Sequence, residues 1–140
     1  MKEIILAMKP KYLELILNGT KTVELRRTHP VTPRLPDRLW LYQGGCIHGS
    51  VDVKSFCFVY GIRHLDMLCY KQNTPKMACV TPDEMWNYLF PAKNPMIYEL
   101  CNPVRAIHPI PVSCRPQSWI YMTDEVRAIV YEPNRKGNQQ

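Results

Sequence analysis

The chain has 140 residues, of which 46% are hydrophobic and 21% charged, proportions typical of an ordinary soluble globular protein. This length predicts one domain whose core needs no disulfide or metal. With 18 Lys and Arg against 12 Asp and Glu, the net charge is +6, which suits a polyanionic partner but does not demand one. No stretch approaches the ~20 apolar residues of a membrane span, so we expect no membrane contact.

The cysteines and histidines form no recognisable metal-binding motif. No two of the six cysteines lie within five residues of each other, so the C-x-x-C spacing of zinc sites does not occur, and the four histidines are scattered. The apolar start of the chain is interrupted by Lys9 and Lys11, unlike a secretion signal. We therefore expect reduced, mostly buried thiols in a cytoplasmic protein that holds no metal and no cofactor.

The start of the chain predicts a strand, a helix and a second strand. Glu3–Met8 is a short apolar run with the length of a central strand. Pro10–Asn18 begins with a proline, which suits the first turn of a helix, and its final Asn is followed by a glycine stop. The next strand is expected at Thr22–Arg27. The three prolines of 28–37 then predict a surface loop, in which His29 and Arg34 could border a cleft.

The rest of the chain alternates between strands and short helices. We expect strands at Arg38–Gln43, Ile47–Tyr60 (bent near Gly49), Ile97–Leu100 and Val104–Ile110, helices at Leu65–Tyr70 and after Thr81, and a helical turn at Pro116–Tyr121. Asp124–Tyr131 fits either a helix or a strand. The fold class predicted is α+β, a small mixed β-barrel with flanking helices over residues 1–131, followed by a polar, disordered tail at 132–140.

The strongest candidate site is the charged stretch around the second strand. Because strand side chains alternate between faces, Glu24 and Arg26 lie on one face, close enough to pair. Lys21 stands at the corner before the strand, where Gly19 leaves the backbone free to turn it toward either face. Burial beside a cation would lower the pKa of this lysine and make it a base or nucleophile, whereas pairing with Glu24 would keep it charged for binding a phosphate.

The same residues carry a family resemblance. Gly19, Lys21, Glu24 and Arg26 match the G-x-K-x-x-E-x-R signature of the ASCH domain family, a branch of the PUA-like β-barrels. The segment before the signature resembles the opening strand and helix of that family. The strand at Arg38–Tyr42 and the turn Arg115–Ser118 resemble two later elements, so the likeness extends over about residues 3–122.

The resemblance implies a domain that binds single-stranded RNA or a nucleotide. Lys21 and Arg26 would neutralise phosphate, and Glu24 would orient Arg26. Tyr42 or Trp119 would stack on a base, since aromatic rings at a cleft commonly do so. Trp40 and Trp86 are expected in the core. A protein-interaction adaptor is a further alternative, but it would leave the charged cluster without a role.

A hydrolase is the second function that the resemblance allows. Some family members resemble ribonucleases, for which Lys21, Arg26, Tyr42 and Ser118 would form the cleft set. Another branch resembles an amidohydrolase that removes the acyl group of N4-acetylcytidine. It uses the motif lysine, a threonine three residues later and a distant acid.

This sequence departs from the amidohydrolase pattern. The lysine position is Lys21, but the threonine position holds Glu24, so these two residues would be the catalytic pair. Thr22 comes only one residue after Lys21 and, in a regular strand, points to the face opposite that lysine. The distant acid has no secure counterpart among Asp52, Glu84 and Glu99.

Overall fold

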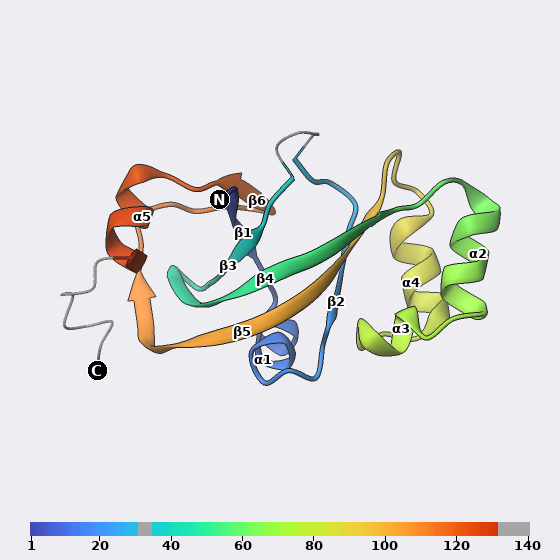
Figure 1. Cartoon of the computed structure of the whole chain (residues 1–140), viewed down its shortest axis with the longest axis horizontal. Coiled ribbons are helices and arrows are strands. Elements are labelled where there is room, and N and C mark those ends of the chain that lie inside the picture. Colours follow the sequence, from blue (N-terminus) through green and yellow to red (C-terminus); the bar gives the residue numbers. More distant parts are fainter. Residues whose placement is uncertain (31–34, 132–140) are drawn as a thin grey trace.

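The computed structural model describes residues 1–30 and 35–131, so Arg34 and the tail predicted at 132–140 lie outside the described residues. Six strands form one mixed sheet in the order β2-β5-β4-β3-β1-β6, with helices around it (Figure 1). The elements in chain order are β1 (Glu3–Ala7), α1 (Pro10–Leu17), β2 (Val23–Arg26), β3 (Arg38–Gln43), β4 (Cys46–Phe58), α2 (Ile62–Tyr70), α3 (Thr74–Met77), α4 (Pro82–Leu89), β5 (Met96–Pro111), β6 (Trp119–Tyr121) and α5 (Asp124–Tyr131).

The sheet curls into a half-barrel, as the predicted fold class required. β1 and β3 pair in parallel, and the other strand pairs are antiparallel. β2 and β6 lie at opposite ends of the hydrogen-bonded order. Arg26 of β2 nevertheless donates a hydrogen bond to the hydroxyl of Ser118, which directly precedes β6. The curl therefore brings the two ends of the sheet to within one side chain of each other.

Three apolar clusters fill the faces of this sheet. The first lies between the sheet and α1 and includes Ile4, Leu6, Ile16, Leu41 and Tyr98. The second joins β2 and β5 to α2 and α4, and the third lies beneath α5 on the other side of β1 and β3. Trp40 belongs to the third cluster at 8% exposure, and Trp86 packs at the border of the second, as expected for core tryptophans.

Two predicted elements are wrong in the second half of the chain. Residues 116–121 do not form a helical turn, because 119–121 pair with the free edge of β1 as strand β6. The two strands expected on either side of Asn102-Pro103 are one strand, β5. Asn102 takes a left-handed φ of 52°, and the register with β4 shifts there, so a local irregularity accommodates the proline. The sequence also gave no sign of α3, and Asp124–Tyr131 is a helix.

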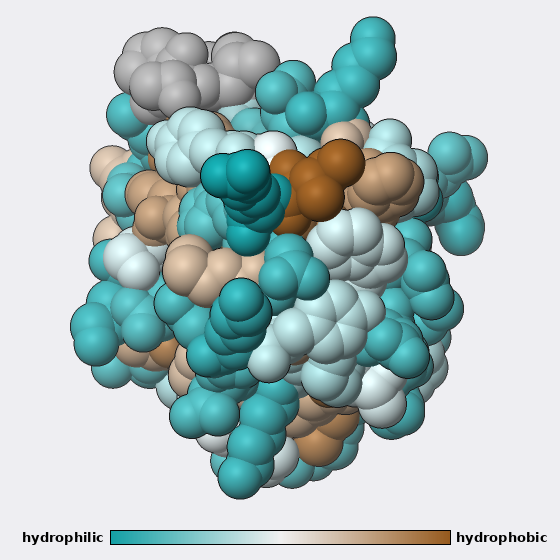
Figure 2. Space-filling view, turned by 90° about the vertical axis from the view of Figure 1, so that its right-hand side faces the viewer, coloured by the Kyte–Doolittle hydropathy of each residue, from teal (hydrophilic) through white to brown (hydrophobic). Residues whose placement is uncertain are grey.

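The end of the molecule that carries α2 and α4 exposes apolar side chains among charged ones (Figure 2). Ile62 and Phe90 are exposed here by 62% and 50%. In residues 1–30 and 35–131, no helix is both long and apolar enough to cross a membrane. All six cysteines are free thiols.

Gly49 lets α1 and β5 approach β4 closely. A Cβ at this position would overlap the carbonyl oxygen of Val104 and would lie 2.8 Å from Cδ2 of Leu17. Backbone cannot yield as a flexible side chain can, so we expect Gly49→Ala to lower the free energy of unfolding by ~1–3 kcal/mol. Urea denaturation measures this loss. Gly44→Asn is the control, because the turn around Gly44 is open and its φ of +61° suits asparagine. Equal stability of Gly49→Ala and wild type would contradict the close packing.

Candidate functional site

The pairing of β2 with β5 sets which side chains face the interior of the half-barrel. Val23 and Leu25 enter the apolar cluster with α2 and α4, so the alternation predicted for this strand is observed. Glu24 and Arg26 point the other way, and Glu24 lies opposite Tyr98 of β5. The polar side chains of β2 are therefore buried beside Tyr98 and do not face solvent.

Lys21 reaches Glu24 because it precedes β2 and is not bound by the alternation of the strand. Its ammonium donates to the carbonyl oxygens of Val23 and Ala78, both at 2.7 Å, and lies 3.5 Å from Oε1 of Glu24. It also lies 5.2 Å from the ring centre of Tyr12 in α1. Burial lowers the pKa of the Lys21 ammonium, and the Glu24 carboxylate opposes that shift. The side chain is only 4% exposed, so it links β2 to the end of α3 from inside the molecule.

Arg26 forms the other half of the charged cluster. Its Nη1 lies 3.2 Å from Oε2 of Glu24, and its Nη2 donates to Ser118 Oγ. Ser118 lies in turn 3.5 Å from the Thr28 hydroxyl. The Nε of Arg26 is buried and has no hydrogen-bond partner among the described residues. A guanidinium in a protein is always protonated, so this N–H remains a free donor beside the cluster.

Tyr98 is a second buried polar group without a partner. Its side chain is fully buried and its hydroxyl contacts no acceptor or donor among the described residues. Burial is the main cause that raises the pKa of this phenol; Arg26 opposes the rise and Glu24 adds to it. Buried hydroxyls and N–H groups are nearly always hydrogen-bonded in proteins, so two orphans around one carboxylate mark this place as unusual.

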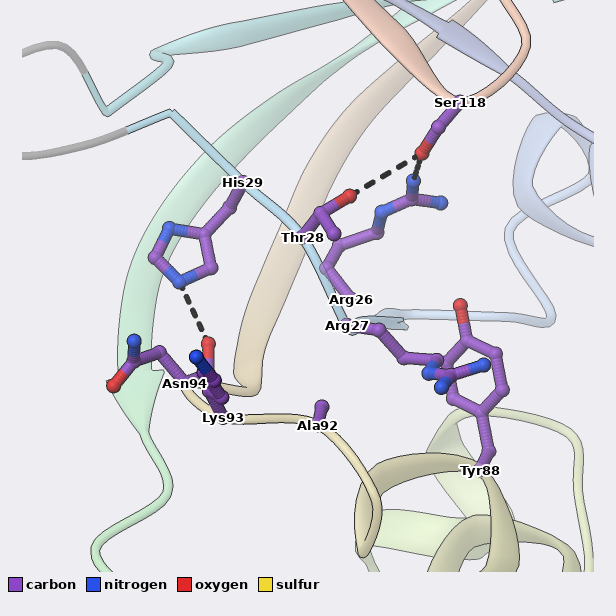
Figure 3. A pocket seen from close by; sticks show the side chains of 9 residues that line it. All are labelled: Arg26, Arg27, Thr28, His29, Tyr88, Ala92, Lys93, Asn94 and Ser118. Atoms are coloured by element: carbon purple, nitrogen blue, oxygen red, sulfur yellow. Dashed lines mark hydrogen bonds between the residues drawn. The ribbon is translucent and has the colours of Figure 1, made fainter.

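The cluster lies at the base of an open groove made of two adjoining chambers. The Lys21 chamber has a volume of about 680 Å³ and includes Lys21, Glu24, Tyr12, Asn87 and Gln117 in its lining. The Arg27 chamber, of about 660 Å³, includes Arg27, Thr28, His29, Lys93 and Ser118 (Figure 3). Arg26 and Tyr88 line both chambers, so a ligand of moderate length can contact both.

The predicted site residues do not all meet in this groove. Lys21, Glu24, Arg26 and Ser118 line it. Tyr42 is 8% exposed and packs in the apolar cluster beneath α5. Trp119 is half-buried and packs against the first apolar cluster, between the sheet and α1. Its ring meets the Tyr121 ring edge-on, with 5.1 Å between ring centres. Neither aromatic ring belongs to the lining of the two chambers.

The three acids considered at the sequence level also separate. Asp52 pairs with Arg38 at 2.7 Å. Glu99 lies opposite Val23, on the face of the sheet away from Glu24, and accepts from Ser55. Glu84 lines the Lys21 chamber, but its carboxylate caps α4 by accepting from the Thr81 backbone.

Several residues of the site were not found from the sequence. Tyr98 lies among the buried first residues of β5, and only the register of β2 with β5 places it beside Glu24. Tyr88 and Tyr12 follow helical patterns that equally predict packing. Arg27 and Lys93 look like ordinary surface cations because they are far apart in sequence. The residues described hold no group of three or more His, Cys, Asp or Glu side chains that could bind a metal ion.

Comparison with known proteins gives the family of the chain. Residues 6–88, more than half of the sequence, match the ASCH domain. The protein therefore belongs to the ASCH domain family, whose PUA-like half-barrel matches the sheet described above. No curated protein sequence matches the chain.

Solved structures support the same fold. The crystal structure of an ASCH protein from Zymomonas mobilis has a TM-score of 0.71 and 20% identity, over 89% of this chain and 90% of that one. A serine-to-alanine variant and a tyrosine-to-phenylalanine variant of that protein give the same TM-score and identity over 89% of this chain, and over 90% and 93% of theirs. At this identity the likeness shows the fold alone.

The Glu24 carboxylate should contribute strongly to stability. Glu24→Gln leaves two buried cations without their counter-ion, and we expect it to lower the free energy of unfolding by about 3 kcal/mol. The control is Glu14→Gln. Glu14 also pairs with an arginine, accepting from Arg105 at 2.8 and 2.9 Å, but on the surface. Urea denaturation should show no change for the control, and equal losses for the two variants would contradict a buried, coupled cluster.

Burial of Lys21 should make stability depend on pH. The folded state holds the pKa of this ammonium below its ordinary value of 10.5, so the unfolded chain binds more protons between the two values. The free energy of unfolding contributed by Lys21 should therefore rise with pH through that window. We expect the difference between wild type and Lys21→Met, measured in urea at several pH values from 7 to 10.5, to shift in favour of wild type. A constant difference would show that the folded and unfolded pKa values are equal.

Proposed function

We propose that the groove binds single-stranded RNA or a nucleotide. The observation that carries this proposal is Arg26, a buried arginine at the junction of both chambers whose Nε–H has no partner among the described residues. A free donor on a permanent cation suits a phosphate or another anionic oxygen. The net charge of +6 favours the same class of partner by long-range attraction.

In this proposal Glu24 orients Arg26, and Lys21 supports Glu24 from behind. The Lys21 ammonium has three N–H groups, and two carbonyl oxygens and the Glu24 carboxylate surround it. Its protons are therefore already engaged within the protein. Lys21 adds positive charge to the floor of the groove, while Arg26 makes the direct contact.

Tyr88 replaces Tyr42 and Trp119 as the ring that stacks on a base. It is 40% exposed, lines both chambers and carries Arg27 over its ring at 5.6 Å. An exposed tyrosine between cations provides the stacking surface and the positive charge that single strands require.

A hydrolase acting on RNA or on a modified nucleoside such as N4-acetylcytidine is the second candidate. It is favoured by the lowered pKa of Lys21, which is the direction that a catalytic base or nucleophile needs. The contacts of Lys21 with two carbonyl oxygens oppose it, because they stabilise the protonated amine. Binding without turnover is therefore the first choice.

Binding is tested with a fluorescein-labelled single-stranded RNA of eight nucleotides. A ligand that places about three phosphates on the groove should give a log–log salt slope near −2, from about 0.7 per phosphate. Tyr88→Ala should weaken binding by about tenfold or more through lost stacking. Tyr60→Ala is the matched control, since Tyr60 is 76% exposed but does not line either chamber. Absence of binding at low salt, or equal effects of both variants, would contradict the proposal.

Turnover separates the two candidates. Wild type and Lys21→Ala are incubated with labelled RNA and with N4-acetylcytidine while their RNA affinities are measured. For a binding protein we expect no product from either substrate. For a hydrolase, Lys21→Ala should abolish product formation and leave affinity within a few-fold. Product formed by wild type but not by Lys21→Ala would replace the binding proposal with the hydrolase.

A further inference from the structure

We propose that the two chambers have separate tasks: the Arg27 chamber holds a phosphate group, and the Lys21 chamber holds the base and sugar attached to it. This inference rests on the proposed function and makes it more specific. It predicts that the ligand is a nucleotide that carries a phosphate, either free or within an RNA chain. An uncharged nucleoside should bind more weakly.

The first argument is the different charge of the two chambers. The Lys21 chamber contains three cations and two carboxylates, from Lys9, Lys21, Arg26, Glu24 and Glu84, so its charges nearly cancel. The Arg27 chamber contains the three cations Arg26, Arg27 and Lys93, and no carboxylate lines it among the described residues. An anion is therefore attracted to the second chamber rather than to the first.

The cations of the Arg27 chamber are available for a ligand. Arg27 and Lys93 are both exposed, and neither takes part in an ion pair between described residues. Figure 3 shows Arg27 lying across Tyr88, and Arg26 turned toward Ser118. Two arginines and a lysine that border one space fit the several oxygens of a phosphate.

Further hydrogen-bond donors add to these surface charges. Arg26 is 8% exposed, and its buried Nε–H, which has no partner among the described residues, is an independent observation that points to a ligand here. The hydroxyls of Thr28 and Ser118, which can donate as well as accept, also line this chamber.

His29 shapes the chamber but is not a free donor. Its Nδ1 lies 2.9 Å from the Pro30 carbonyl oxygen and its Nε2 lies 2.8 Å from that of Asn94. Both ring nitrogens are thus occupied by the backbone. The imidazole joins the segment after β2 to the turn before β5, and this link fixes the wall that carries Lys93.

The Lys21 chamber has the groups that recognise a base. Tyr12 and Tyr88 supply rings, and Met8 and Val80 supply apolar surface. The amide side chains of Asn87 and Gln117 line the same space. An amide carries both a donor and an acceptor, the combination that pairs with the edge of a base exposed in a single strand.

The test compares one nucleoside with its phosphates. Cytidine, cytidine 5′-monophosphate, cytidine 3′-monophosphate and inorganic phosphate are titrated against wild type at low salt, and the ¹H–¹⁵N signal of arginine Nε groups is followed by NMR. We expect at least one monophosphate to bind ten or more times tighter than cytidine and to shift the Arg26 Nε–H signal. Arg27→Gln/Lys93→Gln should remove this advantage while cytidine affinity stays within twofold.

The matched control is Arg63→Gln/Lys71→Gln. It removes two exposed cations, one in α2 and one just after it, which lie outside both chambers. This control changes the net charge by the same amount as Arg27→Gln/Lys93→Gln. Because it leaves the Arg27 chamber intact, the monophosphate should still bind more tightly than cytidine. The inference would be overturned if cytidine and both monophosphates bound equally well, or if Arg27→Gln/Lys93→Gln kept the tighter binding of the monophosphate. Either result would overturn it even if the eight-nucleotide RNA still bound. Failure of wild type to bind that RNA and all four small ligands would instead overturn the proposed function.

Discussion

The hydrogen bond from Arg26 to Ser118 is the contact on which the site depends. It joins the neighbourhoods of β2 and β6, the two strands at opposite ends of the sheet, and so spans the seam where the half-barrel fails to close. An edge strand normally presents unpaired backbone groups that attract other chains. Here a charged side chain crosses the gap, and the space beside it remains open as the groove. The opening that could weaken the sheet is therefore also the place where the proposed ligand would enter.

Burying charge at this seam is expensive unless every member of the cluster has partners. Glu24 pairs with both Lys21 and Arg26, and the ammonium of Lys21 donates hydrogen bonds to two carbonyl oxygens. The arrangement is complete on the side of Lys21 and incomplete on the side of Arg26, where one guanidinium N–H and the Tyr98 hydroxyl lack partners among the described residues. This asymmetry explains why we assign support to Lys21 and ligand contact to Arg26. In the proposed function, the unpaired donors on the side of Arg26 are the groups that a ligand would satisfy.

Family membership and local chemistry answer different questions about this protein. The ASCH match and the half-barrel shared with the Zymomonas mobilis structures define the scaffold, whereas function must be argued from the residues at the site. Glu24 stands at the position where the amidohydrolase pattern described above has a threonine. Here its carboxylate pairs with two cations. Our proposal of a phosphorylated ligand rests on other residues of the groove, especially Tyr88 and the cations of the Arg27 chamber.

The sequence by itself determined the local elements and the members of the charged cluster. The proline at the start of α1, the capping box of α4 and the alternation in β2 depend on neighbouring residues, so they can be recognised in the printed chain. Tertiary structure decided which residues share the groove. The free edge of β1 converted an expected helical turn into β6, the register of β2 with β5 placed Tyr98 beside Glu24, and packing placed Tyr42 in the core. These outcomes rest on contacts between segments far apart in sequence, whose energies depend on the whole curled sheet and leave no local pattern.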